Sequence, residues 1–377
     1  MNDAIDRLRL VRTESVGPVT YRRLMERFGT VAEAISALPE LAKAGGRSTA
    51  PRVPSRAEVE RELNALTRIG GEFIFLGSKN YPPFLAQLPD APPVLAVMGD
   101  ASLLATSSVG IVGARNASAN GMRFAEALGA ELAERLTVVS GLARGIDTAA
   151  HTGALRAGRT VAVIAGGLDM PYPPENAALQ ARIAENGAVV AEAPLGTAPQ
   201  GRHFPKRNRI IAGLVLGLVV MEAAQRSGSL LTARLANEAG RELFGVPGSP
   251  LDPRSKGAND LIRQGAHLTE SAADVFANLP DDPARAGLAR DPMFQHGLPG
   301  FSEAPFSVAD PREDAAGLAR GRREIPAMIG AEPVGVDEIA RRCQLSSAAV
   351  AAVLLELELG GQVETLAGNR VVRHADP

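Results

Sequence analysis

The sequence predicts an α/β protein whose central domain is a doubly wound, mostly parallel sheet. From Glu72 to about residue 278, short runs of Val, Ile, Ala and Gly alternate with longer segments of helical periodicity. Buried strands separated by amphipathic helices are typical of a parallel sheet that is covered on both faces. The segments on either side lack this alternation, so we expect a core domain over 71–278 with separate modules at both ends.

Composition narrows the class of protein. The chain has 377 residues, of which 45% are hydrophobic and 22% charged, and its formal net charge is -2. This length suggests two or three domains, and the near-neutral charge means that any nucleic-acid site must be a local basic patch. Cys343 is the only cysteine and the five histidines lack metal-ligand spacing, which argues against disulfides and a catalytic metal. Without a signal-peptide core or an apolar run of membrane-spanning length, a soluble cytoplasmic protein is expected.

Residues 1–70 predict short helices. A glycine–proline turn at Gly17 separates two runs of helical spacing, and Thr30 is expected to cap the next helix. Ser55 and Glu58 form a capping-box pattern that opens a further helix. Helix, Gly-Pro turn and helix resemble a helix-hairpin-helix or SAM-like module, whose turns can offer backbone N–H groups to phosphate. A small helical bundle without a ligand is the open alternative.

The C-terminal part of the chain predicts a linker and a second small domain. Leu279–Gly321 mixes Pro, Gly, Asp and Arg with few apolar repeats and is expected to be a flexible linker. Residues 322–377 then predict helix, turn, helix and hairpin, which resembles a winged helix. Its second helix, Ser347–Leu359, lacks Arg, Lys, Asn and Gln and carries Glu356 and Glu358, which would repel phosphate. Packing or protein contacts are therefore expected of this domain, and a transcription factor that reads duplex DNA is disfavoured.

The densest group of cations in the chain lies in Arg202–Gly213, RHFPKRNRIIAG, between the strand-like segments Ala188–Ala193 and Val215–Glu222. Cations this close repel one another unless an anion offsets them. Phe204 offers a flat face for a base, and Asn208 can donate and accept hydrogen bonds. We expect a loop and first helical turn at the carboxyl edge of the sheet, where open α/β proteins hold ligands. A solvated, charged helix start without a partner is the alternative.

Other predicted turns after strands pair glycine with a cation or a hydroxyl. These residues are Gly113, Arg115, Ser118, Arg144, Gly145, Ser227, Gly228 and Ser229. Glycine lets a backbone approach a ligand, and a helix N-terminus favours an anion. Neither G-x-G-x-x-G nor a Walker A sequence occurs, so nucleotide cofactors bound by those routes are not supported. Several turns along one sheet edge suit the phosphates of a single-stranded nucleic acid. Tight turns with exposed arginines, and Asp147 as a helix cap, are the structural alternatives.

Taken together and in order, these motifs resemble the DNA-processing protein A (DprA/Smf) family of bacteria. The match rests on VGIVGARNAS, VSGLARGID followed by His151, VIAGGLD with YPPEN, AEAPLG, HFPKRNRIIAGL, the SGSL segment and GVPG, and it spans about Val109–Ala266. The resemblance implies a Rossmann-like core that binds single-stranded DNA as a homodimer, with no catalysis, metal or cofactor. It also implies a recombination mediator that protects incoming single strands and loads RecA in natural transformation.

The resemblance also implies site residues. The family's basic pocket maps to Arg115 and Lys206, and Arg144 and Arg209 are further candidates; whether Arg207 or Arg209 faces DNA is left open. Ala114 stands where many relatives have serine. The full set expected at DNA is Gly113, Arg115, Ser118, Arg144, Gly145, His203, Phe204, Lys206, Arg207, Asn208, Arg209, Ser227, Gly228 and Ser229. The dimer is expected to form around Leu261–Phe276.

An enzyme is the rival prediction. A related Rossmann family cleaves nucleoside monophosphates and has a P-G-G-x-G-T-x-x-E signature. Membership in that family would make this chain a nucleotide phosphoribohydrolase-like protein. The segments Ala165–Asp169 and Ser227–Leu230 do not reproduce that signature. Glu222 is the nearest candidate acid, and it can equally pair with the basic run. Incubation with nucleoside monophosphates and a search for free base separates the two functions.

Overall fold

The computed structural model describes residues 2–280, 311–366 and 369–374, which form two compact units. One unit combines the first 61 residues with the C-terminal domain, and the other is the core, which begins at Glu62. This unit includes part of the helix before residue 71, because Leu66 in that helix packs in one apolar cluster with the sheet residues Ala96 and Ala162. No helix in the described residues is long and apolar enough to cross a membrane.

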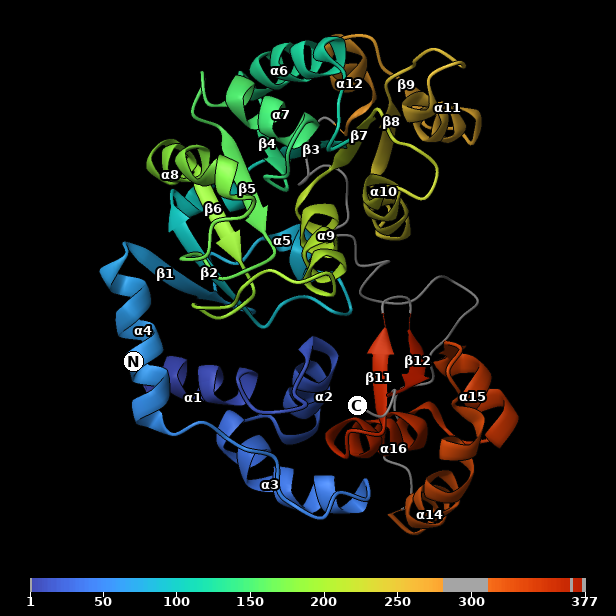
Figure 1. The fold of residues 1–377 in the computed structure, drawn as a ribbon. Coiled ribbons are helices and arrows are strands. Elements are labelled where there is room, and N and C mark those ends of the chain that lie inside the picture. The colour runs from blue at the N-terminus through green and yellow to red at the C-terminus, as the bar shows by residue number, and fades with distance from the viewer. Residues whose placement is uncertain (1, 281–310, 367–368, 375–377) are drawn as a thin grey trace. The chain divides into compact units, whose positions relative to one another are not determined.

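The core is a nine-stranded sheet with the order β1-β2-β6-β5-β4-β3-β7-β8-β9 (Figure 1). The strands are β1 (Gly71–Phe75), β2 (Val94–Gly99), β3 (Ser108–Gly113), β4 (Thr137–Ser140), β5 (Thr160–Ile164), β6 (Ala188–Ala191), β7 (Gly217–Met221), β8 (Glu242–Gly245) and β9 (His267–Leu268). Strands β3 to β9 pair in parallel, whereas β1 and β2 are antiparallel additions at one edge. The chain moves outward in opposite directions from β3 and β7, so the topological switch point lies between these two strands.

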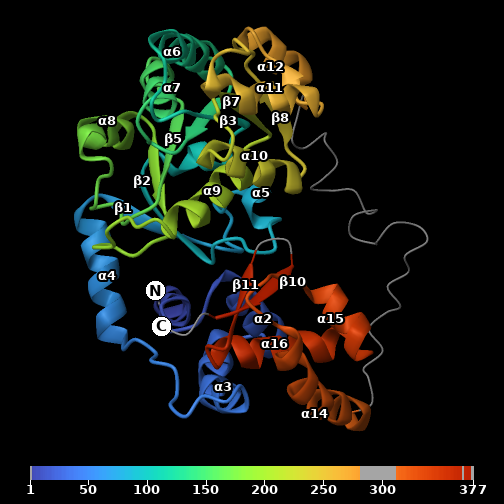
Figure 2. The same cartoon turned by 45° about the vertical axis from the view of Figure 1, so that its right-hand side comes forward.

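Helices cover both faces of the sheet, as predicted (Figures 1 and 2). One face carries α6 (Ala119–Ala133), α7 (Ile146–Ala154), α8 (Ala177–Asn186) and α12 (Ala272–Asn278), and the other carries α5 (Pro83–Ala86), α9 (His203–Leu214), α10 (Gly228–Glu238) and α11 (Lys256–Arg263). Short 3-10 helices lie at Ala101–Ala105, Pro174–Asn176 and Pro253–Ser255. Because both faces are buried, β3 alternates apolar residues toward each layer: Ile111 faces α6 and Val112 faces α9.

The N-terminal helical module supplies the first part of the other unit. Its helices are α1 (Asn2–Val11), α2 (Pro18–Phe28) and α3 (Val31–Ala44), and α4 (Arg56–Arg68) leads out of it. Thr30 caps α3 by accepting a hydrogen bond from Glu33 N, and Ser55 and Glu58 exchange the predicted capping-box bonds. Leu24 and Leu38 lie at the centre of the apolar cluster that α2 and α3 enclose.

The C-terminal domain has the predicted order of helices and hairpin. Its elements are α14 (Pro311–Met328), β10 (Val334–Gly335), α15 (Val336–Cys343), α16 (Ser347–Leu359), β11 (Val363–Leu366) and β12 (Arg370–Arg373), and its sheet has the order β10-β12-β11. Part of the linker prediction is wrong, because α14 runs through Gly321; its many Ala, Arg and Glu residues favour a helix. Residues 281–310 of the predicted linker lie outside the described residues.

Candidate nucleic-acid interface

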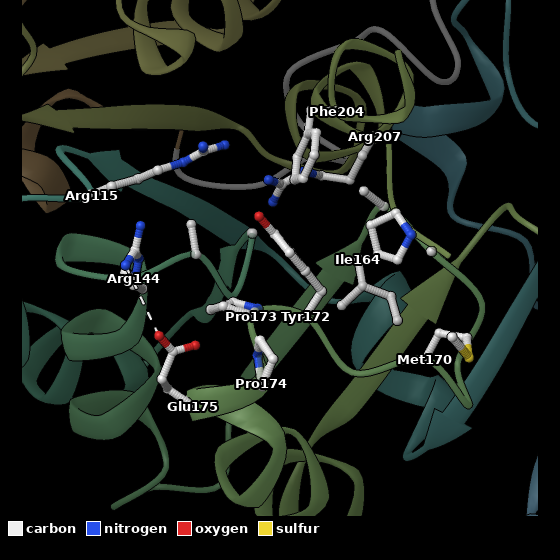
Figure 3. Close-up of a pocket in the computed structure, with 15 residues that line it drawn as sticks. Arg115, Arg144, Ile164, Met170, Tyr172, Pro173, Pro174, Glu175, Phe204 and Arg207 are labelled. Atoms are coloured by element: carbon white, nitrogen blue, oxygen red, sulfur yellow. Dashed lines mark ion pairs between the residues drawn. The ribbon is translucent and has the colours of Figure 1, made fainter. Parts of the chain in front are cut away.

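A pocket of about 180 Å³ lies where the loops after β3, β4 and β5 meet the first turn of α9 (Figure 3). Arg115 comes from the loop after β3, Arg144 from the loop after β4 and Tyr172 from the segment after β5; α9 supplies Phe204 and Arg207. The carboxyl ends of parallel strands share one edge, which is why residues far apart in sequence converge here. The structure thus brings together three of the loops that the sequence placed on one edge.

Phe204 stands among the cations of the pocket (Figure 3). The guanidinium carbon of Arg115 is 5.2 Å from the centre of its ring, and that of Arg207 is 5.9 Å away. The ring of Tyr172 lies 5.8 Å from it, centre to centre, with the planes inclined by 60°. These distances fit cation–π and tilted aromatic contacts, so the rings and cations hold one another in place. Tyr172 is 45% exposed, which leaves part of its ring available to a ligand.

Arg207 is a buried cation at the wall of the pocket. It is 6% exposed, and its Nη1 donates a hydrogen bond to the carbonyl of Val163 at 3.2 Å. A Cβ on Gly141 would meet Nη1 at 1.3 Å, so the guanidinium occupies the space that a side chain there would take. Burial lowers the pKa of Arg207, Asp147 opposes that shift, and the positive charge of Arg115 adds to it. A buried cation next to another cation favours an anionic ligand.

Asp147 holds the turn that lines the pocket. Its Oδ2 accepts hydrogen bonds from Gly141 N at 3.2 Å and Ala143 N at 3.3 Å. The expectation that it caps α7 is wrong, because the residue before that helix is Gly145 and Asp147 stabilises the preceding turn instead. Burial raises the pKa of Asp147, and the nearby charge of Arg207 opposes the rise.

His151, beneath the same turn, is neutral. Thr160 Oγ1 donates its one proton to Val138 O at 2.9 Å and lies 2.7 Å from His151 Nδ1, so Nδ1 is the donor to Thr160. Burial, followed by the charge of Arg207, lowers the pKa of His151 to about 3. The positive charge under the pocket therefore resides on Arg207.

Arg144 and the two glycines beside the pocket have different environments. Arg144 is exposed and approaches Glu175 at 4.0 Å, a surface pair too open to fix its position (Figure 3). A Cβ on Gly113 would meet Met221 O at 2.2 Å, and one on Gly145 would meet Ala114 O at 2.3 Å. Both glycines therefore allow close packing of loop on backbone, which is the structural role that the sequence left open.

The N-terminus of α6 is occupied by a carboxylate of the protein. Ser118 N donates to Glu222 Oε2 at 2.8 Å, Ser118 Oγ bonds to Glu222 Oε1, and the same hydroxyl accepts from Gly121 N at 2.9 Å. Glu222 therefore pairs with this helix start and not with the basic run. A phosphate at Ser118 would have to displace that carboxylate.

The remaining predicted residues lie around α10 and along α9. Ser227 and Ser229 bond to each other at 2.8 Å, and Gly228 O accepts from the buried Asn208 at 3.4 Å. Lys206 is exposed and does not line the pocket. His203 Nδ1 accepts from Gln200 N at 3.2 Å, and its pKa is lowered by partial burial and by the neighbouring Arg202 and Lys206.

Arg207 and Arg209 take opposite roles. Arg209 is 8% exposed, and its guanidinium donates to Asp90 O and to Glu192 Oε1, each at 2.6 Å. These bonds anchor α9 to the loop before β2 and to the end of β6. Of the two arginines, Arg207 is the one that lines the pocket.

Sequence reasoning missed Gly141 and Tyr172 as pocket residues. Both stand in segments that were singled out, SGLARGID and YPPEN, and each follows a predicted strand. The signal for Tyr172 was an aromatic residue in the proline-containing segment that follows β5. Nothing in the sequence indicates that the guanidinium of Arg207 rests on Gly141, because the two residues come from different βα units.

Comparison with known proteins covers nearly the whole chain. Family models described as DNA recombination-mediator protein A, DprA-like N-terminal HHH domain and DprA winged helix domain match residues 72–280, 1–65 and 309–369. Protein Smf of Escherichia coli is 39% identical over 319 residues, covering 84% of this chain and 81% of that protein. Protein Smf of Synechocystis sp. is 33% identical over 391 residues, covering 96% of each.

Two solved structures share the fold. The X-ray structure of DprA from Streptococcus pneumoniae has a TM-score of 0.63 and 36% identity, and the match covers 75% of this chain and 99% of that one. DprA from Helicobacter pylori, described for its single-stranded DNA binding mode, has a TM-score of 0.50 and 30% identity, covering 54% and 94%. With the matches to all three family models, these likenesses show that the chain belongs to the DprA/Smf family of DNA recombination mediators.

Proposed function

We propose that this DNA recombination mediator binds single-stranded DNA, and that the pocket beside α9 is where the strand is held. The observation that carries the proposal is the grouping of Phe204 with Arg115 and Arg207 at the carboxyl edge of the sheet. An aromatic ring between cations suits a base and its flanking phosphates, because stacking tolerates any base and cations track the backbone. The single-stranded DNA binding of the Helicobacter pylori relative supports the same ligand.

The exposure of each side chain in and around the pocket decides the role that we assign to it. Arg115 and Arg144 reach solvent and are assigned to phosphates. Lys206, which is exposed in the first turn of α9, is assigned to a further phosphate of the same strand. Phe204 and Tyr172 are assigned to a base. Arg207 is too buried to leave its place, so it contributes a fixed positive charge. Ser118, Asn208 and Arg209 have protein partners and are assigned to the scaffold.

Family membership supports a wider role than binding alone. We infer that the protein protects incoming single strands in the cytoplasm and loads RecA onto them in natural transformation, without a catalytic step. The test is RecA-dependent ATP hydrolysis on single strands with and without this protein. Faster onset of hydrolysis in its presence is the expected result, and an unchanged or slower onset contradicts loading.

We also infer a homodimer, formed near the β9 edge of the sheet. Strand β9 pairs only with β8 among the described strands, and Leu268 on it is 50% exposed. An exposed apolar residue on an open strand edge favours pairing with another chain. Light scattering at micromolar concentration should give twice the mass of the chain, and Leu268→Lys should give the monomer mass.

The experiment that tests DNA binding compares labelled single-stranded and duplex oligonucleotides by fluorescence anisotropy at two salt concentrations. Tighter binding of the single strand, weakened by salt, is expected because phosphate contacts release counterions. Equal affinity for duplex, or no binding at low salt, would reject the assignment. Parallel incubation with nucleoside monophosphates tests the enzymatic alternative, for which release of free base is the required observation.

A further inference from the structure

The helix α16 of the winged-helix domain is apolar around its whole circumference. Its sequence, SAAVAAVLLELEL, places buried residues on opposite sides: Val353 and Leu357 enter the core of the C-terminal domain, while Leu355 and Leu359 do not. A helix that is hydrophobic on all sides must be covered on all sides. A helix that reads DNA keeps one polar, exposed face for bases and phosphates, and α16 has none.

The second side of α16 is covered by the N-terminal helical module of the same compact unit. Leu355 and Leu359 belong to one apolar cluster with Leu24 of α2 and Leu38 and Leu41 of α3. Figures 1 and 2 both show α16 beside these two helices. Segments more than 300 residues apart in the sequence thus share one core.

The carboxylates of α16 are satisfied inside this arrangement. Glu358 is 6% exposed and accepts hydrogen bonds from Thr20 Oγ1 at 3.0 Å and from Arg23 at 3.4 Å. Glu356 is bonded twice at 2.7 Å by Arg322 of its own domain. A buried carboxylate without partners would be costly. Thr365 of the C-terminal domain donates to Glu358 Oε1, and Thr20 and Arg23 of the helical module supply the donors for Oε2.

The backbones also approach without room for a side chain. A Cβ on Gly45, directly after α3, would meet the carbonyl oxygen of Glu356 at 1.8 Å. A Cβ on Gly360, directly after α16, would meet Gly45 O at 2.2 Å. Gln362 Nε2 donates to that same oxygen at 2.6 Å. Apolar packing, a buried ion pair and close backbone contact are therefore all found between α16 and the helices α2 and α3.

We propose that α16 is a docking helix for the N-terminal helical module of the same chain, so that the helix a winged-helix reader would place in duplex DNA is withheld from nucleic acid. Its acidic residues and its lack of basic ones fit this role, because the carboxylates oppose phosphate and Glu358 finds its cation, Arg23, on α2. The two terminal modules then unfold and refold locally as one unit, although the core lies between them in the sequence.

The test is hydrogen exchange of the full-length protein, followed by mass spectrometry of peptides from α3 and α16. Gly45→Ala places a methyl group against Glu356 O, and Gly17→Ala is the matched control, because nothing lies within 4 Å of its Cβ position. Gly45→Ala should speed exchange in both helices by roughly tenfold, since overpacking of this kind weakens an interface. Gly17→Ala should leave both helices as in wild type, and single-stranded DNA affinity should stay unchanged in both variants.

Acceleration confined to α3 in Gly45→Ala would overturn the proposal. If Gly45→Ala does not fold, Thr20→Val removes the hydroxyl donor to Glu358 and should speed exchange in α2 and α16 together by a few-fold. A second arm adds saturating duplex DNA to the wild-type protein. Protection of α16 should not change; a loss of protection on adding duplex would show that DNA displaces the helical module, and would also overturn the proposal.

Discussion

Two places on the carboxyl edge of the core sheet combine glycine turns with helix N-termini, but their charges are balanced differently. At the switch point between β3 and β7, the start of α6 is met by the carboxylate of Glu222. In the pocket beside α9, Arg115 and Arg207 make no ion pair with any described residue. A glycine turn and a helix dipole are present at both, so the exposed cation Arg115, which has no carboxylate partner among the described residues, distinguishes the proposed anion site from its neighbour.

The largest effect should come from closing the pocket. Gly141→Ala places a methyl group where the guanidinium of Arg207 lies, so the guanidinium must shift and give up its hydrogen bond to Val163 O. We expect single-stranded DNA affinity to fall by about tenfold or more and the free energy of unfolding to fall by ~1–3 kcal/mol. Gly201→Ala is the control, since nothing lies within 4 Å of its Cβ position just before α9. Wild-type binding by Gly141→Ala would show that the position of Arg207 is not needed.

Acid should destabilise the layer beneath the pocket. Unfolded histidine titrates near 6.5, whereas the pKa of buried His151 is about 3, so the unfolded chain takes up the proton first as pH falls. Stability is therefore full above pH 6.5 and is lost toward pH 3, with a loss of about 2 kcal/mol by pH 5 from this group. Urea unfolding at pH 7 and pH 5 measures it. His151→Asn should lose about 2 kcal/mol less over that interval, and an equal loss in both proteins refutes the assignment.

Removing an exposed cation from the pocket should weaken binding without unfolding the core. Arg115→Ala should lower the slope of log affinity against log salt by roughly 0.7, the value for one phosphate on a single strand. Melting temperature should stay near wild type because Arg115 is exposed. Arg209→Ala is the informative contrast: it breaks a buried pair with Glu192 and should lower stability by ~3–5 kcal/mol. If Arg115→Ala loses stability as Arg209→Ala does, Arg115 is structural.

A weaker effect should follow from removing the carboxylate charge at the switch point, which makes the start of α6 more like the pocket. Glu222→Gln removes the negative charge at the start of α6 while keeping one oxygen to accept from Ser118. We expect single-stranded DNA affinity to rise by a few-fold, since one helix-terminal charge is worth ~0.3–1 kcal/mol. Anisotropy at low salt has the resolution for this change. A fall in affinity would mean that Glu222 supports the DNA site, contrary to the contrast between the two places.

Much of this arrangement could be predicted because it follows from chain order. Alternating strands and helices predict a parallel sheet, and a parallel sheet places every βα turn on one edge. The sequence therefore predicts that Arg115, Arg144 and Phe204 lie at the same edge. The packing role expected for α16 also followed from its sequence, because a helix without a polar face must be buried.

The charge balance could not be predicted in the same way. Residues 207 and 209 are separated by about 200° around a helix, so one arginine had to face away from the other. Which of them faces the pocket depends on Glu192 and Asp90, which α9 meets only in the folded chain. Glu222 likewise finds Ser118 across two neighbouring strands. Sequence identifies the charges, and tertiary contacts decide which remain for a ligand.

Lys206 tests how far the DNA site extends beyond the pocket. It was expected at the DNA with Arg115, but the structure places it on the exposed side of α9, beyond the pocket lining. If the strand continues from the pocket along α9, Lys206→Ala should lower the salt slope by up to roughly 0.7 and leave sequence preference unchanged. Because its side chain reaches solvent, the melting temperature should not change.

Lys43→Ala, which removes an exposed lysine of the other unit, controls for the loss of one positive charge. Binding by Lys206→Ala that matches Lys43→Ala at every salt concentration would confine the DNA site to the pocket, whereas a slope change equal to that of Arg115→Ala would extend it along the basic turn.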